Sequence, residues 1–341
     1  MTARMVGVAG SGSLLLLDTK PADLSLVAPY VDTNAEAVPG DPLLTVRFVD
    51  RLPRRELRLV GERHAVDDRA LLMRSGAGWA RLPLGDANAG DELVCERRVD
   101  EVPHLVDLLN LAALHRGALP LHAAALARDG AGVLLVGWSK GGKTEAVLAR
   151  TARGDRLVAD EWVHLDSQLT ARALGYRMRI WAWQLAQAPH VAGRLSAKER
   201  RRLAAVGTLL RVAPQAVRSP LERRHGSYLR PEAAFPGQLA AAAVVSQVVL
   251  LESHDVSDVT SMEADAGLVA ERAAASTRFE RRGLMESYAA LRYALPGISD
   301  SRLDEAHAIE LAMARERLGQ LPARVVAHPY PVDLDRLGDV V

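Results

Sequence analysis

Short apolar runs separated by turn residues characterise the first hundred residues of the chain. Within each run the residues are apolar or alternate between apolar and polar, and clusters of Pro, Gly, Asn and Asp stand between the runs. Such runs are typical of β-strands, and the intervening residues are typical of the turns that join them. Four runs have this form: 12–17, 43–49, 56–60 and 70–73. We therefore predict a smaller, β-rich N-terminal domain over residues 1–100.

After residue 100 the apolar positions recur every three or four residues, which is the period of an α-helix. From Val102 to Ala113 they share one helical face, with Pro103 near the first turn and Gly117 suited to the C-terminal cap. The other predicted elements of this part are helices over 194–210 and 264–295, strands over 244–251 and 324–332, and an irregular segment over 220–236. We therefore predict an α/β domain over residues 101–341.

Three short elements in the middle of this domain predict a β–α–β unit. Residues 132–136 (GVLLV) are all apolar between turn residues, which is typical of a parallel strand buried on both faces. Residues 144–153 follow a helical pattern that ends at Gly154, and residues 156–159 (RLVA) form a second apolar run. The order strand, helix, strand is that of a crossover unit.

Composition narrows the class of protein without naming its activity. Of the 341 residues, 49% are hydrophobic and 25% are charged, a balance typical of a globular protein that can bury a full core. The net charge of +1 provides no overall field to recruit nucleic acid or an anionic membrane, so we expect neither as a partner. The single cysteine, Cys95, excludes an intramolecular disulfide framework and a cysteine-based zinc cluster.

The start of the sequence lacks the order of charged, apolar and small residues that marks a signal peptide. The apolar runs are also shorter than the ~20 residues that a membrane-spanning helix needs. We therefore expect a cytoplasmic protein.

Residues 137–144 carry the clearest chemical signal in the chain. They read Gly-Trp-Ser-Lys-Gly-Gly-Lys-Thr and fit G-x-x-x-x-G-K-[ST], the phosphate-binding loop, between a predicted strand and a predicted helix. Glycines let the backbone N–H groups turn toward phosphate oxygens, and the helix N-terminus adds a partial positive charge. We expect Lys143 to contact the β- and γ-phosphates and the Thr144 hydroxyl to bind Mg²⁺. The predicted nucleotide-binding residues are Gly137, Ser139, Lys140, Gly141, Gly142, Lys143 and Thr144.

Lys140 has two interpretations, a second positive charge near the phosphates or an ordinary exposed lysine. Asp160 and Glu161 directly follow the predicted strand 156–159, so their carboxylates are expected at the ligand edge of the sheet. There one acid can associate with Mg²⁺ while the other accepts a proton from an attacking hydroxyl. Alternatively, Asp160 only caps the following segment or pairs with an arginine.

Residues 121–166 resemble the catalytic core of the HPr kinase/phosphorylase family. The resemblance rests on His122, which lies 15 positions before Gly137, on the apolar strand, the phosphate loop and the short helix, and on the Leu-Val-Ala-Asp strand end with its paired acid. The short link from Lys143 to Asp160 also looks like this family rather than like most phosphate-loop enzymes.

This resemblance implies an HPr kinase/PEP carboxykinase-type catalytic domain with a mixed sheet over residues 101–341. It implies ATP and Mg²⁺ as ligands, with Thr144, Asp160 and Glu161 near the metal. Asp160 would be the catalytic or metal-associated acid, and His122 its hydrogen-bonding neighbour. It also suggests a homo-oligomer.

The chain departs from the family pattern in three places. The second acid is Glu161 where the family has aspartate, the loop carries Trp138 and Lys140, and the later Glu-Ile-Arg-Gly signature is missing. Its place is held by residues 175–183, where Arg177 and Arg179 alternate with apolar residues as on a strand with one polar face. One of these arginines, with Arg179 the candidate, could hold the transferred phosphoryl group; otherwise both lie on a solvated strand face.

Three of the five tryptophans lie in or near this block and have two interpretations. They are Trp162, Trp181 and Trp183. They either line a pocket for adenine or substrate, or pack in the core as large aromatics usually do.

The sequence predicts an ATP- and Mg²⁺-dependent kinase that transfers the γ-phosphoryl group to a hydroxyl. The expected acceptor is a serine of a peptide or protein, or a small biosynthetic metabolite. The altered acid pair and the missing signature motivate the alternative, a nucleotide-binding regulatory or scaffold protein with little phosphotransfer.

Overall fold

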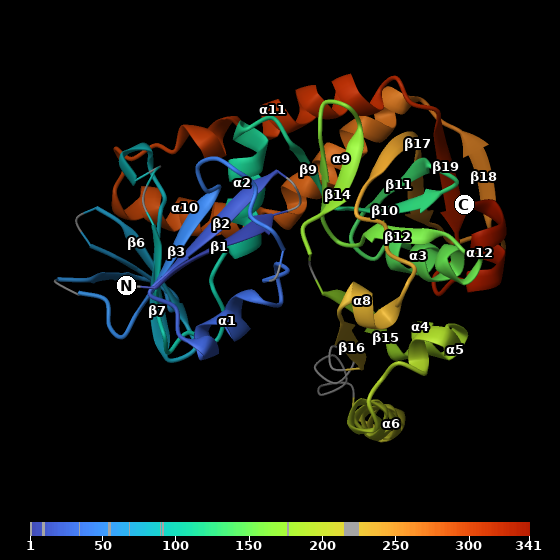
Figure 1. Cartoon of the computed structure of the whole chain (residues 1–341), viewed down its shortest axis with the longest axis horizontal. Helices are drawn as coiled ribbons and strands as arrows, with labels where there is room; N and C mark the ends of the chain where they lie inside the picture. Colours follow the sequence, from blue (N-terminus) through green and yellow to red (C-terminus); the bar gives the residue numbers. More distant parts are fainter. Residues whose placement is uncertain are drawn as a thin grey trace.

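Two separate β-sheets, connected by long helices, form the framework of the molecule (Figure 1). The computed structural model describes residues 2–8, 11–33, 35–53, 56–67, 69–88, 90, 92–175, 177–214 and 225–341. In this part of the chain the fold is α/β with mixed sheets, as the sequence predicted. None of the described helices is both long and apolar enough to cross a membrane.

The first sheet has eight strands in the order β1-β2-β3-β8-β7-β6-β5-β4. Its strands are β1 (Ala3–Val8), β2 (Gly12–Leu17), β3 (Leu44–Val49), β4 (Arg58–Val60), β5 (His64–Val66), β6 (Leu71–Ser75), β7 (Gly78–Leu82) and β8 (Leu93–Glu96). Helix α1 (Pro21–Val27) connects the parallel neighbours β2 and β3, and the 3-10 helix η1 (Asp86–Asn88) precedes β8. The four predicted runs are confirmed as β2, β3, β4 and β6.

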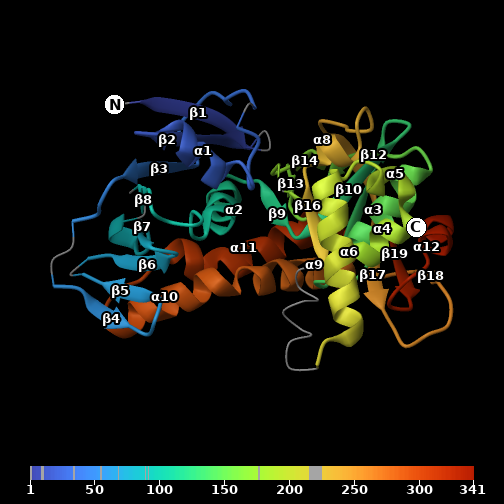
Figure 2. The ribbon, with the colours of Figure 1, turned by 90° about the horizontal axis from the view of Figure 1, so that it is seen from below.

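Helices from later parts of the chain complete the core of this first sheet (Figure 2). They are α2 (Leu105–His115), α10 (Arg282–Ala294) and the start of α11 (Ser301–Leu318). Leu284, Leu291 and Leu303 are buried in the same cluster as Val46 and Phe48 of the sheet. The hydrophobic core of the N-terminal part therefore includes residues on both sides of position 100.

The second sheet has nine strands and carries the phosphate loop. Its main path is β12-β10-β11-β17-β14-β13-β9, and β19 pairs with both β17 and β18. The strands are β9 (Leu119–Leu121), β10 (Ala123–Arg128), β11 (Ala131–Gly137), β12 (Arg156–Ala159), β13 (Val163–Leu165), β14 (Thr170–Ala173), β17 (Ala243–Ser253), β18 (Thr260–Glu263) and β19 (Ala323–His328). Because β11, β17 and β19 run parallel, their carboxyl ends meet at one edge.

The predicted β–α–β unit is confirmed as β11, α3 (Lys143–Ala152) and β12. The two strands are parallel but not adjacent, because β10 lies between them and is antiparallel to both. Helices α3 and α12 (Leu334–Val340) pack on one face of the sheet, and α9 (Ala266–Glu280) and α11 pack on the other. Leu134 and Leu135 of β11 are thus buried from both faces, as the sequence predicted.

A smaller unit over residues 177–234 lies below the second sheet in Figure 1. It contains the antiparallel pair β15 (Met178–Trp181) and β16 (Gly226–Leu229), with helices α4 (Ala182–Gln187), α5 (Pro189–Ala192), α6 (Ala197–Val212) and α8 (Pro231–Ala234). The prediction of an irregular segment over 220–236 is wrong for residues 226–234, which form β16 and α8; residues 220–224 lie outside the described residues. The predicted helical range 264–295 is confirmed as two helices, α9 and α10, which are separated by a break at Arg281.

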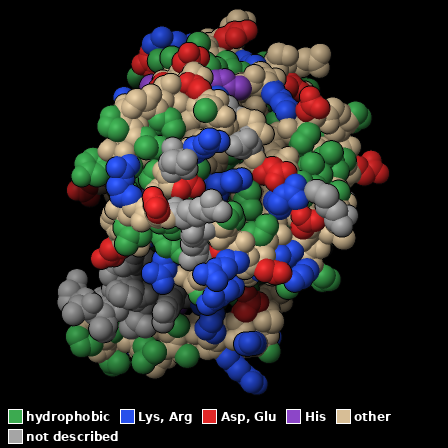
Figure 3. Space-filling model, turned by 90° about the vertical axis from the view of Figure 1, so that its left-hand side faces the viewer, with side chains coloured by type: hydrophobic (Ala, Val, Ile, Leu, Met, Phe, Trp, Pro, Cys, Tyr) green, Lys and Arg blue, Asp and Glu red, His purple; other side chains and the backbone are tan. Residues whose placement is uncertain are grey.

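Helix α6 gathers positive charge on an otherwise nearly neutral chain. Its exposed basic residues are Lys198, Arg200, Arg201, Arg202 and Arg211, and Leu203 is its one buried residue. In Figure 3 Lys and Arg side chains collect toward the lower end of the molecule, where α6 lies in Figure 1. The net charge of +1 is a sum over the whole chain, so it does not reveal the local basic surface on α6.

Candidate functional site

The phosphate loop occupies the turn between β11 and α3, at the carboxyl edge of the parallel strands. Gly137 ends β11, and the Gly141 N–H donates to the Trp138 carbonyl at 2.9 Å, which closes the turn. Lys140 adopts a left-handed conformation (φ 64°), which costs free energy for a residue with a Cβ. The loop is therefore held in one tight shape by its own backbone.

Gly142 is the position where this loop requires glycine. It has φ 101°, and a Cβ added there would lie 2.4 Å from Nε2 of His328, the last residue of β19. His328 is fully buried, and its Nε2 lies 3.0 Å from the Gly141 carbonyl. His328, at the end of β19, therefore packs against the loop and supports it.

We expect Gly142→Ala to weaken nucleotide binding strongly, because the new methyl group must displace either His328 or the loop. We expect the affinity to fall about tenfold. The strain of a few kcal/mol would be divided between the loop and His328, so that only part of it weakens binding. Isothermal titration with MgATP measures it, with Gly297→Ala as the control, since a Cβ there meets open space. Equal affinity in the two variants would show that the loop tolerates the shift.

Lys143 is buried inside the loop that it is expected to serve. Its ammonium donates to the carbonyls of Gly137 and Trp138, both at 3.0 Å, and the residue is 6% exposed. Burial lowers the pKa of Lys143, while the nearby charges of Glu161, Asp160 and Glu280 oppose that shift. Lys143 is thus a compact, buried cation at the loop where the phosphates are expected to bind.

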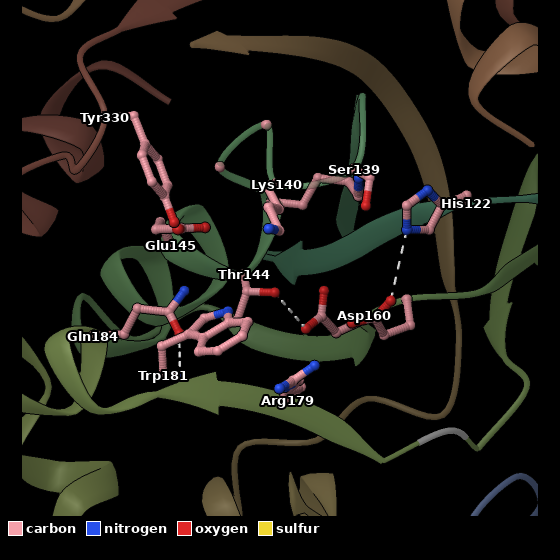
Figure 4. Close-up of a pocket in the computed structure, with 14 residues that line it drawn as sticks. His122, Ser139, Lys140, Thr144, Glu145, Asp160, Arg179, Trp181, Gln184 and Tyr330 are labelled. Carbon is pink, nitrogen blue, oxygen red and sulfur yellow. Dashed lines mark hydrogen bonds and ion pairs between the residues drawn. The ribbon is translucent and has the colours of Figure 1, made fainter. Parts of the chain in front are cut away.

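Thr144 and Asp160 meet across the cavity, as predicted for a magnesium site. The Thr144 hydroxyl donates to Oδ2 of Asp160 at 3.0 Å, although the two residues are 16 positions apart (Figure 4). A hydroxyl and a carboxylate are the oxygen donors that Mg²⁺ prefers. The described residues contain no group of three or more His, Cys, Asp or Glu suited to a metal. A Mg²⁺ bound here would be held by the Thr144 hydroxyl and the Asp160 carboxylate.

Among the described residues His122 lies against Glu161, whereas the resemblance implied Asp160 as its neighbour. Oε2 of Glu161 lies 3.6 Å from Nε2 of His122, an ion-pair distance rather than a well-formed hydrogen bond. On its other side the His122 ring lies 3.3 Å from the Ser276 hydroxyl and 3.7 Å from Glu280. Ser276 in turn donates to the Gly137 carbonyl at 2.9 Å. His122 therefore connects the second acid to helix α9 and, through Ser276, to the loop.

The two neighbouring acids have opposite pKa shifts. Burial, together with the charge of Glu161, raises the pKa of Asp160 to about 7. Burial also opposes ionisation of Glu161, but the imidazole of His122 and the positive charges of Lys143 and Arg179 outweigh it and lower the pKa of Glu161. Two close carboxylates that titrate apart are suited to different roles, because one stays ionised while the other can exchange a proton near neutral pH.

Arg179 reaches the same cavity from β15. Its guanidinium lies 4.1 Å from the ring centroid of Trp181 and 5.4 Å from that of Tyr228. Met178 and Ile180, on the other face of the strand, are fully buried, so the predicted alternation is confirmed. Arg177 precedes β15 and does not line the cavity.

These groups surround a cavity of about 200 Å³ (Figure 4). The structure brings nearly all predicted site residues to its wall: His122, Ser139, Lys140, Gly141, Gly142, Lys143, Thr144, Asp160, Glu161 and Arg179. Gly137 does not line it and contributes its carbonyl to Lys143 instead. Lys140 is thus at the cavity, as the first of its two interpretations expects.

Three lining residues were not predicted: Glu145, Gln184 and Tyr330. Glu145 follows the loop motif directly, so adjacency was the one signal that could have identified it. Gln184 lies in a segment that contains no motif, and Tyr330 is almost two hundred positions from the loop.

The three tryptophans were expected either to line a pocket or to pack in the core, and each interpretation holds for at least one of them. Trp162 is 8% exposed, packs in the N-terminal core cluster and lies 5.8 Å from the His122 ring. Trp181 lines the cavity. Trp183 packs edge-on against Tyr330, with ring centroids 5.7 Å apart.

Comparison with known proteins adds nothing to this geometry, because no protein-family model matches the chain and no curated protein matches it.

Proposed function

We propose that the chain is a nucleoside triphosphate-dependent kinase, with ATP and Mg²⁺ as its expected ligands. The observation that carries the proposal is the Thr144–Asp160 hydrogen bond at 3.0 Å beside the buried ammonium of Lys143. A phosphate loop and a hydroxyl–carboxylate pair whose acid, Asp160, has a pKa of about 7 are parts that phosphoryl transfer needs.

Binding of the triphosphate would use groups of the loop that are already in place. The backbone N–H groups of the loop and of the first turn of α3 would hold the phosphate oxygens. Lys143 would turn from the carbonyls of Gly137 and Trp138 to the β- and γ-phosphates. Mg²⁺, when bound, supplies positive charge that offsets the charge building up on the phosphates.

Asp160 is the proposed proton acceptor. The acceptor hydroxyl would lose its proton to the Asp160 carboxylate while its oxygen bonds to the γ-phosphorus and the bond to the β-phosphate oxygen breaks. Arg179 and Lys143 would stabilise the charge on the transferred group. Glu161, kept ionised beside His122, would remain a fixed negative charge that positions this histidine.

A hydroxyl is the proposed acceptor because Asp160, next to the phosphate loop, can take up one proton. The proposed acceptor is a serine of a peptide or protein, or a small biosynthetic metabolite. We also propose a homo-oligomer, on the resemblance alone, and a cytoplasmic location, on the sequence pattern.

The direct test is turnover of γ-labelled ATP with Mg²⁺, alone and with pools of peptides, proteins and small metabolites from the cell of origin. The proposal expects label in one acceptor fraction and its loss in Asp160→Asn. Tight ATP binding without label in any fraction would instead favour a nucleotide-binding regulatory or scaffold protein. No binding of ATP would reject both functions.

A further inference from the structure

The cavity has two chemically different ends. At one end lie the carboxylates of Asp160 and Glu161 with His122, and at the other lie Tyr330 and Gln184 (Figure 4). A nucleoside triphosphate is also two-ended, since its charged phosphates carry a flat base with apolar faces. The two ends of the cavity and of such a ligand can be matched in one orientation.

The direction of the phosphate chain follows from helix α3. The γ-phosphate is expected beside the Thr144–Asp160 pair, where a divalent cation and the proton acceptor lie. The free N–H groups of the helix N-terminus lead from there past Glu145. Tyr330 and Glu145 both line this end of the cavity. The nucleoside therefore leaves the loop on the Tyr330 side.

Tyr330 is held in place but keeps an exposed face. It is 49% exposed, and Trp183 packs edge-on against it. The segment after it is fastened to α4 by Gln187, which donates to the Val332 carbonyl at 3.2 Å and accepts from the Leu334 N–H at 3.0 Å. A rigid, half-exposed ring at the mouth of a phosphate site has the geometry of a stacking surface.

The polar groups at this end are already engaged. Gln184 Oε1 accepts from the Trp181 N–H at 2.6 Å, and the Gln184 side chain also hydrogen-bonds Glu145. Glu145 is 4% exposed, so its carboxyl offers little surface to a base edge. Stacking on a ring face depends on the size of the base rather than on its donors and acceptors.

We propose that Tyr330, braced by Trp183, stacks against the base of the bound nucleoside triphosphate and selects large purine rings over pyrimidines with little discrimination between adenine and guanine. This inference rests on the proposed function, because it assumes that a nucleotide occupies the loop. It concerns the nucleoside alone and makes no use of the acceptor.

The test compares dissociation constants for MgATP, MgGTP, MgUTP and magnesium tripolyphosphate by titration calorimetry. The wild type is expected to bind ATP and GTP within about threefold of each other and UTP more weakly, since stacking is tolerant of base identity. Tyr330→Ala is expected to weaken ATP binding about 10- to 100-fold, the usual range for one lost base stack, and to leave tripolyphosphate binding unchanged. Tyr330→Phe should retain most of the affinity.

Two controls separate this site from its rival. Tyr293→Ala removes an exposed tyrosine of α10 that is 81% exposed and should change no constant. The rival is a groove of about 440 Å³ on the other side of the loop, where Trp138 lies on Phe279 at 4.4 Å. Loss of ATP affinity in Trp138→Ala but not in Tyr330→Ala would place the base there and overturn the assignment.

Other outcomes would also overturn it, and they differ from a failure of the proposed function. If tripolyphosphate binds as tightly as ATP, the phosphate site exists but the base does not stack. If Tyr330→Ala weakens both ligands equally, Tyr330 supports the loop instead. If the wild type binds neither ligand, the nucleotide site itself is refuted, and the stacking assignment is refuted with it.

Discussion

Replacing Lys143 by alanine is expected to abolish measurable MgATP binding. The ammonium is the cation buried within the loop, and carboxylates of Glu161, Asp160 and Glu280 lie close enough to influence its pKa. Without it, the phosphates would face these acids with less compensation. Removing one partner of a buried charge pair costs about 2–5 kcal/mol, so we expect affinity to fall by roughly 30- to 5,000-fold. Titration calorimetry measures the change.

Two further variants make this result specific. Lys198→Ala removes an exposed lysine at the start of α6 and should bind MgATP like the wild type. Lys143→Arg should remain defective, because a planar guanidinium cannot occupy the space of a compact ammonium between the Gly137 and Trp138 carbonyls. Thermal unfolding checks that each variant is folded. Unchanged ATP affinity in Lys143→Ala would refute the phosphate-loop assignment.

Asp160→Asn should remove phosphoryl transfer while leaving nucleotide binding largely intact. The amide keeps the size of the side chain and can still accept from the Thr144 hydroxyl, but it cannot take up a proton. General base catalysis contributes about 10²–10⁴-fold, so we expect kcat to fall by about 10³-fold. Single-turnover assays with labelled ATP measure it. Full transfer activity in this variant would mean that another group accepts the proton.

The same substitution should stabilise the fold at pH 8. Burial and the charge of Glu161 raise the pKa of Asp160 from 3.8 to about 7, so the folded state prefers the protonated acid. That preference stabilises the fold below pH 3.8 and is lost as the pH rises through about 7. At pH 8 the wild type therefore carries an unfavourable buried charge that asparagine lacks, and the variant should melt a few degrees higher.

The sign of this effect has a matched control. Asp166, at the turn between β13 and β14, has a lowered pKa: burial opposes the shift, but hydrogen bonds from Thr170, Arg172 and Gln168 outweigh it. Its carboxylate therefore contributes stability above its unfolded pKa, and that contribution is lost as the pH falls. Asp166→Asn should lower the melting temperature at pH 8, opposite to Asp160→Asn. A lower melting temperature for both variants would contradict the pKa shift of Asp160.

The pattern of the chain was sufficient for elements whose signal is local. The strand 12–17 and the helix after Gly142 follow from short-range periodicity and turn residues, and both were found with bounds within a residue of the prediction. The break at Arg281 was not found, because the apolar period continues through it. This arginine is 4% exposed and is paired with Glu310 of α11, a partner that the local pattern does not contain.

The sequence by itself identified the phosphate-loop motif and the acid that lies beside it. A strand, a glycine-rich turn and a helix N-terminus are contiguous, so their chemistry is specified within about thirty residues. The position of Asp160 followed in the same way, since it directly follows the next strand of the same unit. Both predictions needed only neighbours along the chain.

The tertiary structure alone decided what surrounds that loop. His328 supports Gly141 from 187 positions away, Ser276 reaches His122 across 154 positions, and Tyr330 closes the far end of the cavity. His328, Ser276 and Tyr330 stand in no motif, because a contact between distant segments depends on sheet order and helix packing rather than on spacing in the chain. Hydrogen bonds within the loop set its local shape, while long-range packing placed Tyr330 at the cavity and buried Asp160, which raises the pKa of Asp160.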